Sequence, residues 1–226
     1  MNRFSDQALP EPSAASLVLA GSEGYEGESS WRSDWSLIAG IGKFPYPLKF
    51  ALYGEPRHIH WELVAEVIEV LNHIAPSLQA DFAKSHADVT LPIHISACES
   101  WQESSSPAFC SGRSAGEANS DFIKAFESHV WIDVRDYFRD SYLTNLPTLR
   151  HELGHITGLL HTPCPGSQMS VSSEVGQGVY FNTSDLATIA TIHDDRFLGG
   201  MTLEEARVAL GIEKDSTWEN MLANPT

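Results

Sequence analysis

The spacing of apolar residues changes near residue 55 and predicts a strand followed by a helix. Residues 48–53 alternate imperfectly between apolar and polar side chains and are bounded by Pro47 and Gly54, which is typical of a β-strand. In the next segment, apolar residues recur at intervals of three and four, which predicts an amphipathic helix that Pro76 ends. The apolar positions of this helix are Ile59, Leu63, Val67, Leu71 and Ile74.

Three further strands are predicted before residue 135. Residues 89–96 are rich in strand-forming side chains, and Pro92 indicates that this strand lies near an edge of the sheet or carries a bulge. Residues 97–120 are rich in Ser and Gly and predict a long loop. Residues 122–126 and 129–134 follow as two more strands, so we expect a sheet of about four strands.

The second half of the chain predicts three helices. The first begins at Asn145, a plausible helix cap, and runs to about Gly158. The second opens at Asn182, and the third begins at Thr202, where Glu205 completes a capping box. The buried side of the second helix is expected to carry Leu186, Ile189 and either Ile192 or His193.

Composition predicts one folded domain with an appendage. Residues 1–35 carry Ser, Gly, Pro and Glu with little periodicity, which is typical of a flexible N-terminal arm or pro-segment. The remaining chain, residues 36–226, is expected to form a single domain that ends in a helical extension over about residues 200–226. With 42% hydrophobic residues in a chain of 226, a packed core is feasible.

The charge balance limits the classes of partner. Fourteen Lys and Arg against 30 Asp and Glu give a formal net charge of −16, which is the wrong sign for nucleic acid or an anionic membrane surface. Because no run of about 18 apolar residues is present, no transmembrane helix is expected either. No secretory signal is recognised near the start of this sequence. We expect a monomer.

Three cysteines, Cys98, Cys110 and Cys164, allow at most one intramolecular disulfide. A Cys98–Cys110 bridge would close the Ser-rich loop. Three reduced thiols are the alternative, since the redox compartment is undetermined.

One string, residues 151–161, carries the chemistry of the sequence. His151 and His155 are four positions apart on the predicted helix, so both imidazoles project from one face and can reach one metal ion. Glu152 lies about 100° around the helix, which suits a group that contacts a metal-bound water without binding the metal. Gly158 falls where the chain must turn sharply, and the turn allows His161 to return as a third ligand. Three imidazoles would leave the fourth tetrahedral position to water, as in catalytic zinc sites.

The length of the string makes it specific. At the His and Glu frequencies of this chain, H-E-x-x-H alone would arise by chance in roughly 3% of such sequences. Gly158 and His161 lower that figure to about one in ten thousand. A helix whose histidines are merely solvated or satisfied is the competing interpretation.

The string resembles the signature of the metzincin clan of zinc endopeptidases, H-E-x-x-H-x-x-G-x-x-H followed by a methionine turn. Met169, eight residues after His161 and preceded by a Pro-Gly pair, is the candidate for that turn, with spacing similar to the matrixin branch. The resemblance implies one catalytic zinc ion, Glu152 as general base and Met169 as the hydrophobic floor beneath the metal. The implied zinc ligands are His151, His155 and His161.

The resemblance also implies a fold and further properties. The fold would be an α/β (α+β) zincin, with a twisted mixed sheet of about four to five strands, a long zinc-binding helix and a C-terminal helix. An extended substrate would add antiparallel to a sheet edge, for which residues 122–126 are the candidate; an ordinary edge strand is the alternative. Calcium binding and secretion are features of such domains, but no D-x-D-x-D-G loop is present. Val171 stands where astacin-like and serralysin-like members place a tyrosine, so no tyrosine ligand is assigned.

The sequence therefore predicts a zinc-dependent endopeptidase that acts on protein or peptide substrates. Two alternatives stay open. One is a catalytically silent zincin-fold module that binds a protein partner. The other is a zinc hydrolase with a non-protein substrate.

Several other residues are assigned ordinary structural roles. His58 and His60, just before a helix, are interpreted as solvated or capping histidines. Trp61 and Trp131 are expected in the core rather than on a substrate platform. Cys164 is not expected to bind zinc, because it would compete with the catalytic water. The other histidines set aside as ligands are His73, His86, His94, His129 and His193.

Overall fold

The computed structural model describes residues 12–21, 43, 47–96, 112–115, 129–133, 145–159, 161–162, 165–170 and 180–223. The strands are β1 (Lys49–Gly54), β2 (Asp81–Phe82), β3 (Leu91–Ser96), β4 (Gly112–Ala115) and β5 (His129–Asp133). The α-helices are α1 (Ala14–Gly21), α2 (His58–Ile74), α3 (Asn145–Ile156), α4 (Thr183–Ile192), α5 (Leu203–Ala209) and α6 (Ser216–Ala223). Two short 3₁₀ turns are η2 (Pro76–Leu78) and η3 (His86–Asp88). The chain is therefore of mixed helix and strand, as the sequence predicted.

The five strands form one mixed sheet in the order β2-β1-β3-β5-β4. Parallel pairing joins β1 to β2 and β3, and β3 to β5, whereas β4 runs antiparallel to β5. The strands predicted at residues 48–53 and 129–134 are confirmed as β1 and β5. The strand predicted at residues 122–126 lies outside the described residues. The prediction of a loop throughout 97–120 is wrong at β4, whose sequence GRSA has no β-branched or aromatic residue to signal a strand.

Pro92 predicted that its strand lies near an edge of the sheet or carries a bulge, and this prediction is also wrong. Its strand, β3, lies in the middle of the sheet, and the register with β1 continues through Ala51 and Pro92 with no bulge. Pairing with β5 starts one residue later, at Ile93. Proline is tolerated here because a single missing N–H near the start of a strand removes at most one bond of the ladder.

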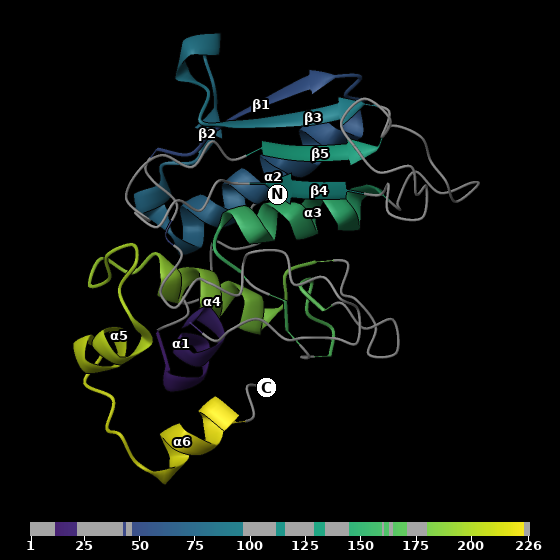
Figure 1. Ribbon diagram of the computed structural model, residues 1–226. Coiled ribbons are helices and arrows are strands. Elements are labelled where there is room, and N and C mark those ends of the chain that lie inside the picture. Colours follow the sequence, from purple (N-terminus) through teal and green to yellow (C-terminus); the bar gives the residue numbers. More distant parts are fainter. Residues whose placement is uncertain are drawn as a thin grey trace.

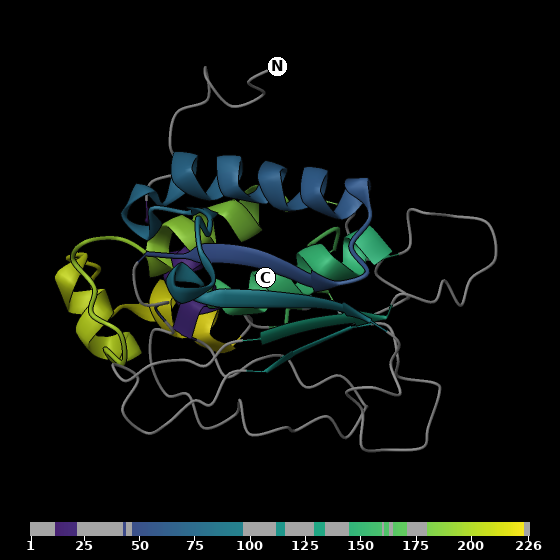
Figure 2. The same cartoon turned by 90° about the horizontal axis from the view of Figure 1, so that it is seen from above.

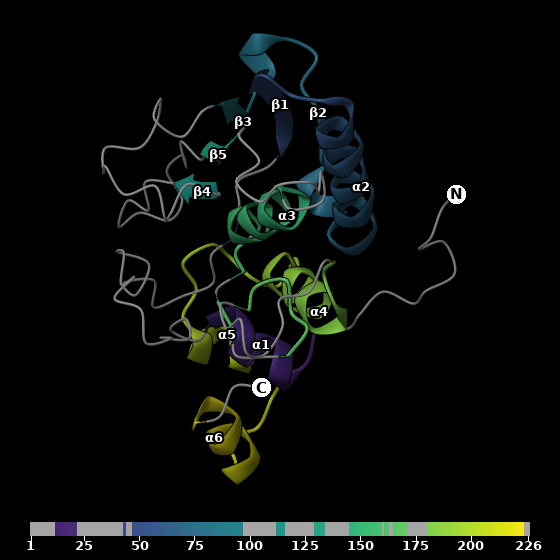
Figure 3. The same cartoon turned by 90° about the vertical axis from the view of Figure 1, so that its right-hand side faces the viewer.

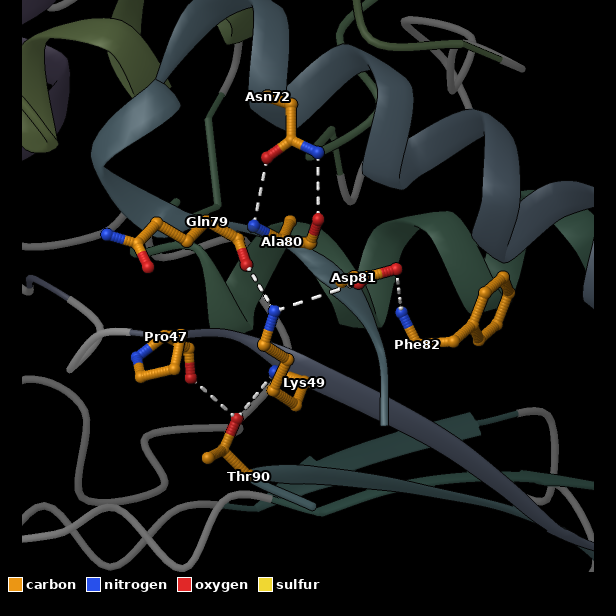
Figure 4. A network of polar contacts seen from close by, with 8 residues as sticks. All are labelled: Pro47, Lys49, Asn72, Gln79, Ala80, Asp81, Phe82 and Thr90. Carbon is orange, nitrogen blue, oxygen red and sulfur yellow. Dashed lines mark hydrogen bonds and ion pairs between the residues drawn. The ribbon is translucent and has the colours of Figure 1, made fainter. Parts of the chain in front are cut away.

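Polar side chains fasten the short edge strand β2 to the rest of the molecule (Figure 4). The Asn72 side chain, on α2, donates to the Ala80 carbonyl at 2.8 Å and accepts from the Ala80 amide at 2.9 Å. Lys49 Nζ donates to the Gln79 carbonyl at 3.0 Å. The Thr90 hydroxyl accepts from the Lys49 amide at 2.7 Å and donates to a carbonyl of the segment that enters β1. The backbone at this edge is thereby paired although β2 has only two residues.

Helices α2 and α3 lie on the same side of the sheet (Figure 3). Helix α2 runs alongside the strands (Figure 2) and ends ahead of Pro76 as predicted. Its start was predicted too late, because His58 and His60, expected just before the helix, lie in its first turn. Apolar residues from both helices and from the strands share one core. The buried members are, from α2, Leu63, Val64, Val67, Val70, Leu71 and Ile74; from α3, Leu149, Leu153 and Ile156; and from the strands, Phe50, Leu52, Leu91, Ile93, Ile95 and Val130.

The expectation of a flexible arm over residues 1–35 is wrong for residues 14–21, which form α1. Leu17 is 0% exposed and Val18 1% exposed, and the Thr191 hydroxyl of α4 donates to Ser16 Oγ at 2.7 Å. Helix α1 lies beside α4 and close to α5 (Figure 1). The apolar run of α1 is too short for its period to be recognised, since only the fold supplies the surface that covers it.

Helices α4 and α5 begin as predicted, whereas α6 was expected only as part of a helical extension over about residues 200–226. Asn182 caps α4 by accepting from the Asp185 amide, and Thr202 and Glu205 form the capping box of α5. Ile189 and Ile192 of α4 and its C-cap His193 are buried, and Leu186 is partly buried against the core. Among the described helices, none combines the length and the apolar composition needed to cross a bilayer.

Candidate metal site

Helix α3 carries the first two histidines of the site and lies between the sheet and α4 (Figures 1 and 3). Its end is a Schellman turn: the Leu159 amide donates to the Gly154 carbonyl at 3.0 Å, and the Gly158 amide donates to the His155 carbonyl at 2.9 Å. Gly158 has φ of 97°, which a side chain would strain. The sharp turn predicted at Gly158 is confirmed, and it turns the chain back toward α3.

The turn brings three imidazoles together. The Nε2 atoms of His151 and His155 lie 3.2 Å apart, those of His151 and His161 3.2 Å, and those of His155 and His161 3.1 Å. Among the described residues, this is the one group of three His, Cys, Asp or Glu side chains that could hold a metal ion. The sequence prediction had named the same three side chains.

Backbone carbonyls fix the outer nitrogens of two of the rings. His151 Nδ1 lies 2.8 Å from the Gln168 carbonyl oxygen, and His155 Nδ1 lies 2.9 Å from the Leu159 carbonyl oxygen. A carbonyl only accepts, so each Nδ1 carries the hydrogen, and each neutral ring therefore presents a bare lone pair at Nε2. The Nε2 atoms of His151 and His155 thus face each other as two hydrogen-bond acceptors.

Two of the three rings, those of His155 and His161, have a lowered pKa and are therefore neutral near pH 7. Burial, and then the neighbouring His151 and His161, hold the pKa of His155 well below its ordinary value. Burial and His151 lower the pKa of His161 to about 4. Clustered lone pairs of this kind repel one another unless a cation lies between them.

The spacing fits a small divalent ion. A tetrahedral ion with bonds of about 2.0–2.1 Å to nitrogen requires nitrogens about 3.3–3.4 Å apart. The observed separations of 3.1–3.2 Å approach that value. Neutral imidazoles suit zinc, copper, iron and nickel, whereas calcium and magnesium prefer oxygen. The donor set therefore fits a transition metal such as zinc.

Glu152 follows the first histidine on α3 and is 8% exposed. Burial of a carboxylate is unfavourable unless partners compensate it, and such groups are enriched at catalytic sites. The helix places Glu152 about 100° around its axis from His151. The carboxylate can therefore contact a water bound at the site without joining the cluster of imidazoles.

Met169 packs against α3 from a separate segment, and its side chain is 1% exposed. A Cβ added at Gly154 would lie 2.5 Å from Met169 Sδ, so the two segments touch where α3 has no side chain. The Thr162 amide donates to the Met169 carbonyl at 3.2 Å, which ties the segment to the residue after His161. The structure thus places the predicted methionine against the turn of α3 that separates His151 from His155.

Asp185 has a role at the site that its sequence context did not predict. This α4 carboxylate is 4% exposed, accepts from the Ser167 hydroxyl at 2.6 Å and accepts from the Gln168 amide at 2.9 Å. It therefore supports the segment whose carbonyl contacts His151. A buried acidic residue at the third position of a helix was the available signal, but it cannot be distinguished in sequence from a simple helix cap.

Arg150, next to His151, was also not predicted to have a role. It is 4% exposed, lies 3.4 Å from a carboxylate oxygen of Glu66 on α2, and lies 4.6 Å from the centre of the Tyr180 ring. These contacts join α3 to α2 and to the segment that leads into α4. The role is structural, since the side chain is directed at these neighbours.

Three of the histidines set aside in the sequence have ordinary partners. His60 is buried and accepts from the Arg57 amide, so it caps α2 as predicted, and exposed His58 pairs with Glu62 at 3.2 Å. Buried His193 bonds the Thr157 carbonyl at 3.0 Å. Trp61 was expected in the core and is instead 41% exposed beside Phe82. Its position on the outer face of α2 explains the difference.

Some predictions lie outside the described residues. They concern Cys98, Cys110, Cys164, Val171 and the strand at 122–126. For Trp131 and His129 only the backbone of β5 is described.

No protein-family model and no curated protein matches the chain. The chemistry of the site is therefore inferred from the chain's own residues.

Proposed function

We propose that the protein is a zinc-dependent endopeptidase of the metzincin type. The observation that supports this proposal most strongly is the convergence of three imidazole Nε2 atoms within 3.1–3.2 Å of one another. Side chains from a single helix and its terminal turn supply all three, and a buried carboxylate lies next to the first. Three imidazole ligands with one position left for solvent are typical of catalytic zinc centres, which supports the proposal.

Within that proposal, Glu152 moves the proton. A bound zinc ion would supply a Lewis acid that lowers the pKa of its water toward about 7 and polarises the substrate carbonyl. Glu152 would accept the proton of the attacking water on a carboxylate oxygen and return it to the nitrogen of the leaving amine. The general base returns to its ionised form at the end of the cycle.

The sheet offers an edge for an extended substrate. In the described sheet β4 is the outer strand on the side of α3, and it contacts that helix. A peptide that pairs with β4 would lie beside the histidine-bearing helix, with backbone hydrogen bonds for affinity. In this proposal β4 takes the place that the sequence analysis gave to residues 122–126.

The proposal is tested with the purified chain, one equivalent of zinc and casein or gelatin as substrate. We expect cleavage that a chelator abolishes and zinc restores. Glu152→Gln should retain zinc and lose about 10²–10⁴-fold in rate, because the general base is removed and the ligands are kept. Glu62→Gln, on the exposed part of α2, is the matched control and should cleave as the wild type does.

Two outcomes would contradict the proposal. A wild type that binds zinc stoichiometrically and cleaves no peptide in a broad library would favour the binding module. Hydrolysis of a non-peptide ester or amide only, with the same dependence on Glu152, would favour the other zinc hydrolase.

A further inference from the structure

A chain of hydrogen bonds runs from α4 to the first histidine of the metal site. The Ser167 hydroxyl donates to Asp185 Oδ1 at 2.6 Å, and the Met169 amide donates to Ser167 Oγ at 2.9 Å. The same peptide unit, between residues 168 and 169, presents its carbonyl to His151 Nδ1 at 2.8 Å. The path therefore passes from a carboxylate through a hydroxyl and one peptide group to an imidazole.

Every member of this path is held in place. Asp185 is 4% exposed and Ser167 is 0% exposed. Asp185 Oδ2 accepts from the Gln168 amide at 2.9 Å and from the Asn182 amide at 3.0 Å. The carboxylate is therefore fixed by three donors, which compensates the cost of its burial.

We propose that Asp185 and Ser167 are positioning residues that set the metal affinity of His151, an inference that rests on the metal site of the proposed function. The negative charge attracts the Ser167 proton, so the hydroxyl oxygen becomes a better acceptor for the Met169 amide. That bond polarises the peptide group, and its carbonyl then attracts the Nδ1 proton of His151 more strongly. His151 Nε2 gains electron density and a fixed direction, which is the effect of a carboxylate bonded directly to a metal-binding histidine.

Asp185 also belongs to the N-terminal cap of α4, so the test must separate the two roles. Asn182→Ala removes the side chain that accepts from the Asp185 amide at 2.9 Å and leaves the bonds to residues 167–169 in place. It is the matched control for loss of the cap. Ser167→Ala breaks the path at its second member, and Asp185→Asn removes the charge with little change of shape.

The experiment measures zinc dissociation constants of the zinc-free full chain against a chromophoric chelator. It also records the visible spectrum of the cobalt form and the thermal unfolding of each variant. We expect Ser167→Ala and Asp185→Asn to weaken zinc binding about tenfold or more and to shift the cobalt bands. Asn182→Ala should lower the unfolding temperature and leave the zinc constant within about threefold of the wild type.

Affinities of Ser167→Ala and Asp185→Asn within about threefold of the wild type would overturn the proposal, as would an equal loss in Asn182→Ala. If Ser167→Ala fails to fold, the comparison of Asp185→Asn with Asn182→Ala decides the same question. A wild type that binds zinc and cleaves nothing would overturn the endopeptidase and leave this inference standing. A wild type that binds no zinc would overturn both.

Discussion

Gly154 on α3 faces Met169, in the methionine segment (residues 165–170), with no room for a side chain between them. Alanine would normally favour a helix over glycine by about 0.5–1 kcal/mol. Here its Cβ would lie 2.5 Å from Met169 Sδ and 3.3 Å from the Phe181 ring. Because Met169 is 1% exposed, its sulfur cannot move away freely, and overpacking of this kind costs about 1–3 kcal/mol.

We therefore expect Gly154→Ala to lower the free energy of unfolding, measured in urea, by about 1–2 kcal/mol. The double variant Gly154→Ala/Met169→Ala should lose less than the sum of the single variants, since the shorter side chain relieves the overlap. Additive losses would show that the two residues do not interact.

His193 makes stability depend on pH. Burial lowers the pKa of His193 to about 4, although its bond to the Thr157 carbonyl acts in the opposite direction. In the unfolded chain the pKa is about 6.5, so as the pH falls below that value the unfolded state takes up the proton first. The stability contributed by neutral His193 is thus complete above about pH 6.5 and is lost progressively toward pH 4.

We expect this single group to remove about 3 kcal/mol of stability between pH 7 and pH 4. His193→Gln keeps a donor for the Thr157 carbonyl and does not titrate. Its unfolding free energy, measured in zinc-free protein, should therefore fall less steeply than that of the wild type. Parallel pH profiles would contradict the assignment.

Among the elements, α1 shows that the N-terminal part of the chain contributes to the core. Leu17 is 0% exposed, whereas Ala15 on the same helix faces solvent. Truncation of a fully buried leucine costs about 2–5 kcal/mol. Leu17→Ala should lower the unfolding free energy by that amount, and Ala15→Ser should change it by less than about 0.5 kcal/mol. A neutral Leu17→Ala would mean that α1 is not part of the cooperative unit.

Elements with a clear period could be predicted from sequence, and those without one could not. Helix α2 has apolar residues along its whole buried face and a proline just beyond its end, so its bounds follow from local rules. Strand β4 has only small and polar residues, so no side-chain pattern marks it as a strand. It is defined by its antiparallel pairing with β5. For α1, the decisive contribution is burial against α4, and the two residues that bond across this contact are 175 positions apart.

In the whole molecule, metal binding and folding should be coupled. A ligand that binds only the folded state stabilises it by about 2.7 kcal/mol at a concentration 100 times its dissociation constant. Zinc in excess should therefore raise the unfolding temperature of the wild type by several degrees, and a chelator should reverse the change. His161→Ala should abolish most of this rise. An unfolding temperature that is the same with and without zinc would contradict a metal site formed in the native state.

In the candidate site, too, residues set by local spacing could be predicted, and residues set by long-range packing could not. His151, His155 and His161 could be predicted because a helix and one turn set their spacing. Asp185 and Ser167 could not, since 18 positions separate them and their contact depends on how α4 packs. Spacing thus identifies the candidate ligands, and only the packed fold shows what orients them.

The Schellman turn has a consequence for the order of folding. Because all three imidazoles lie between positions 151 and 161, closing the chain around a cation costs little loop entropy. An ion can therefore be captured by α3 and its turn before α4 and the methionine segment arrive, and it would serve as a nucleus for them. Refolding with zinc present from the start should be faster than refolding followed by zinc addition, as stopped-flow fluorescence would show.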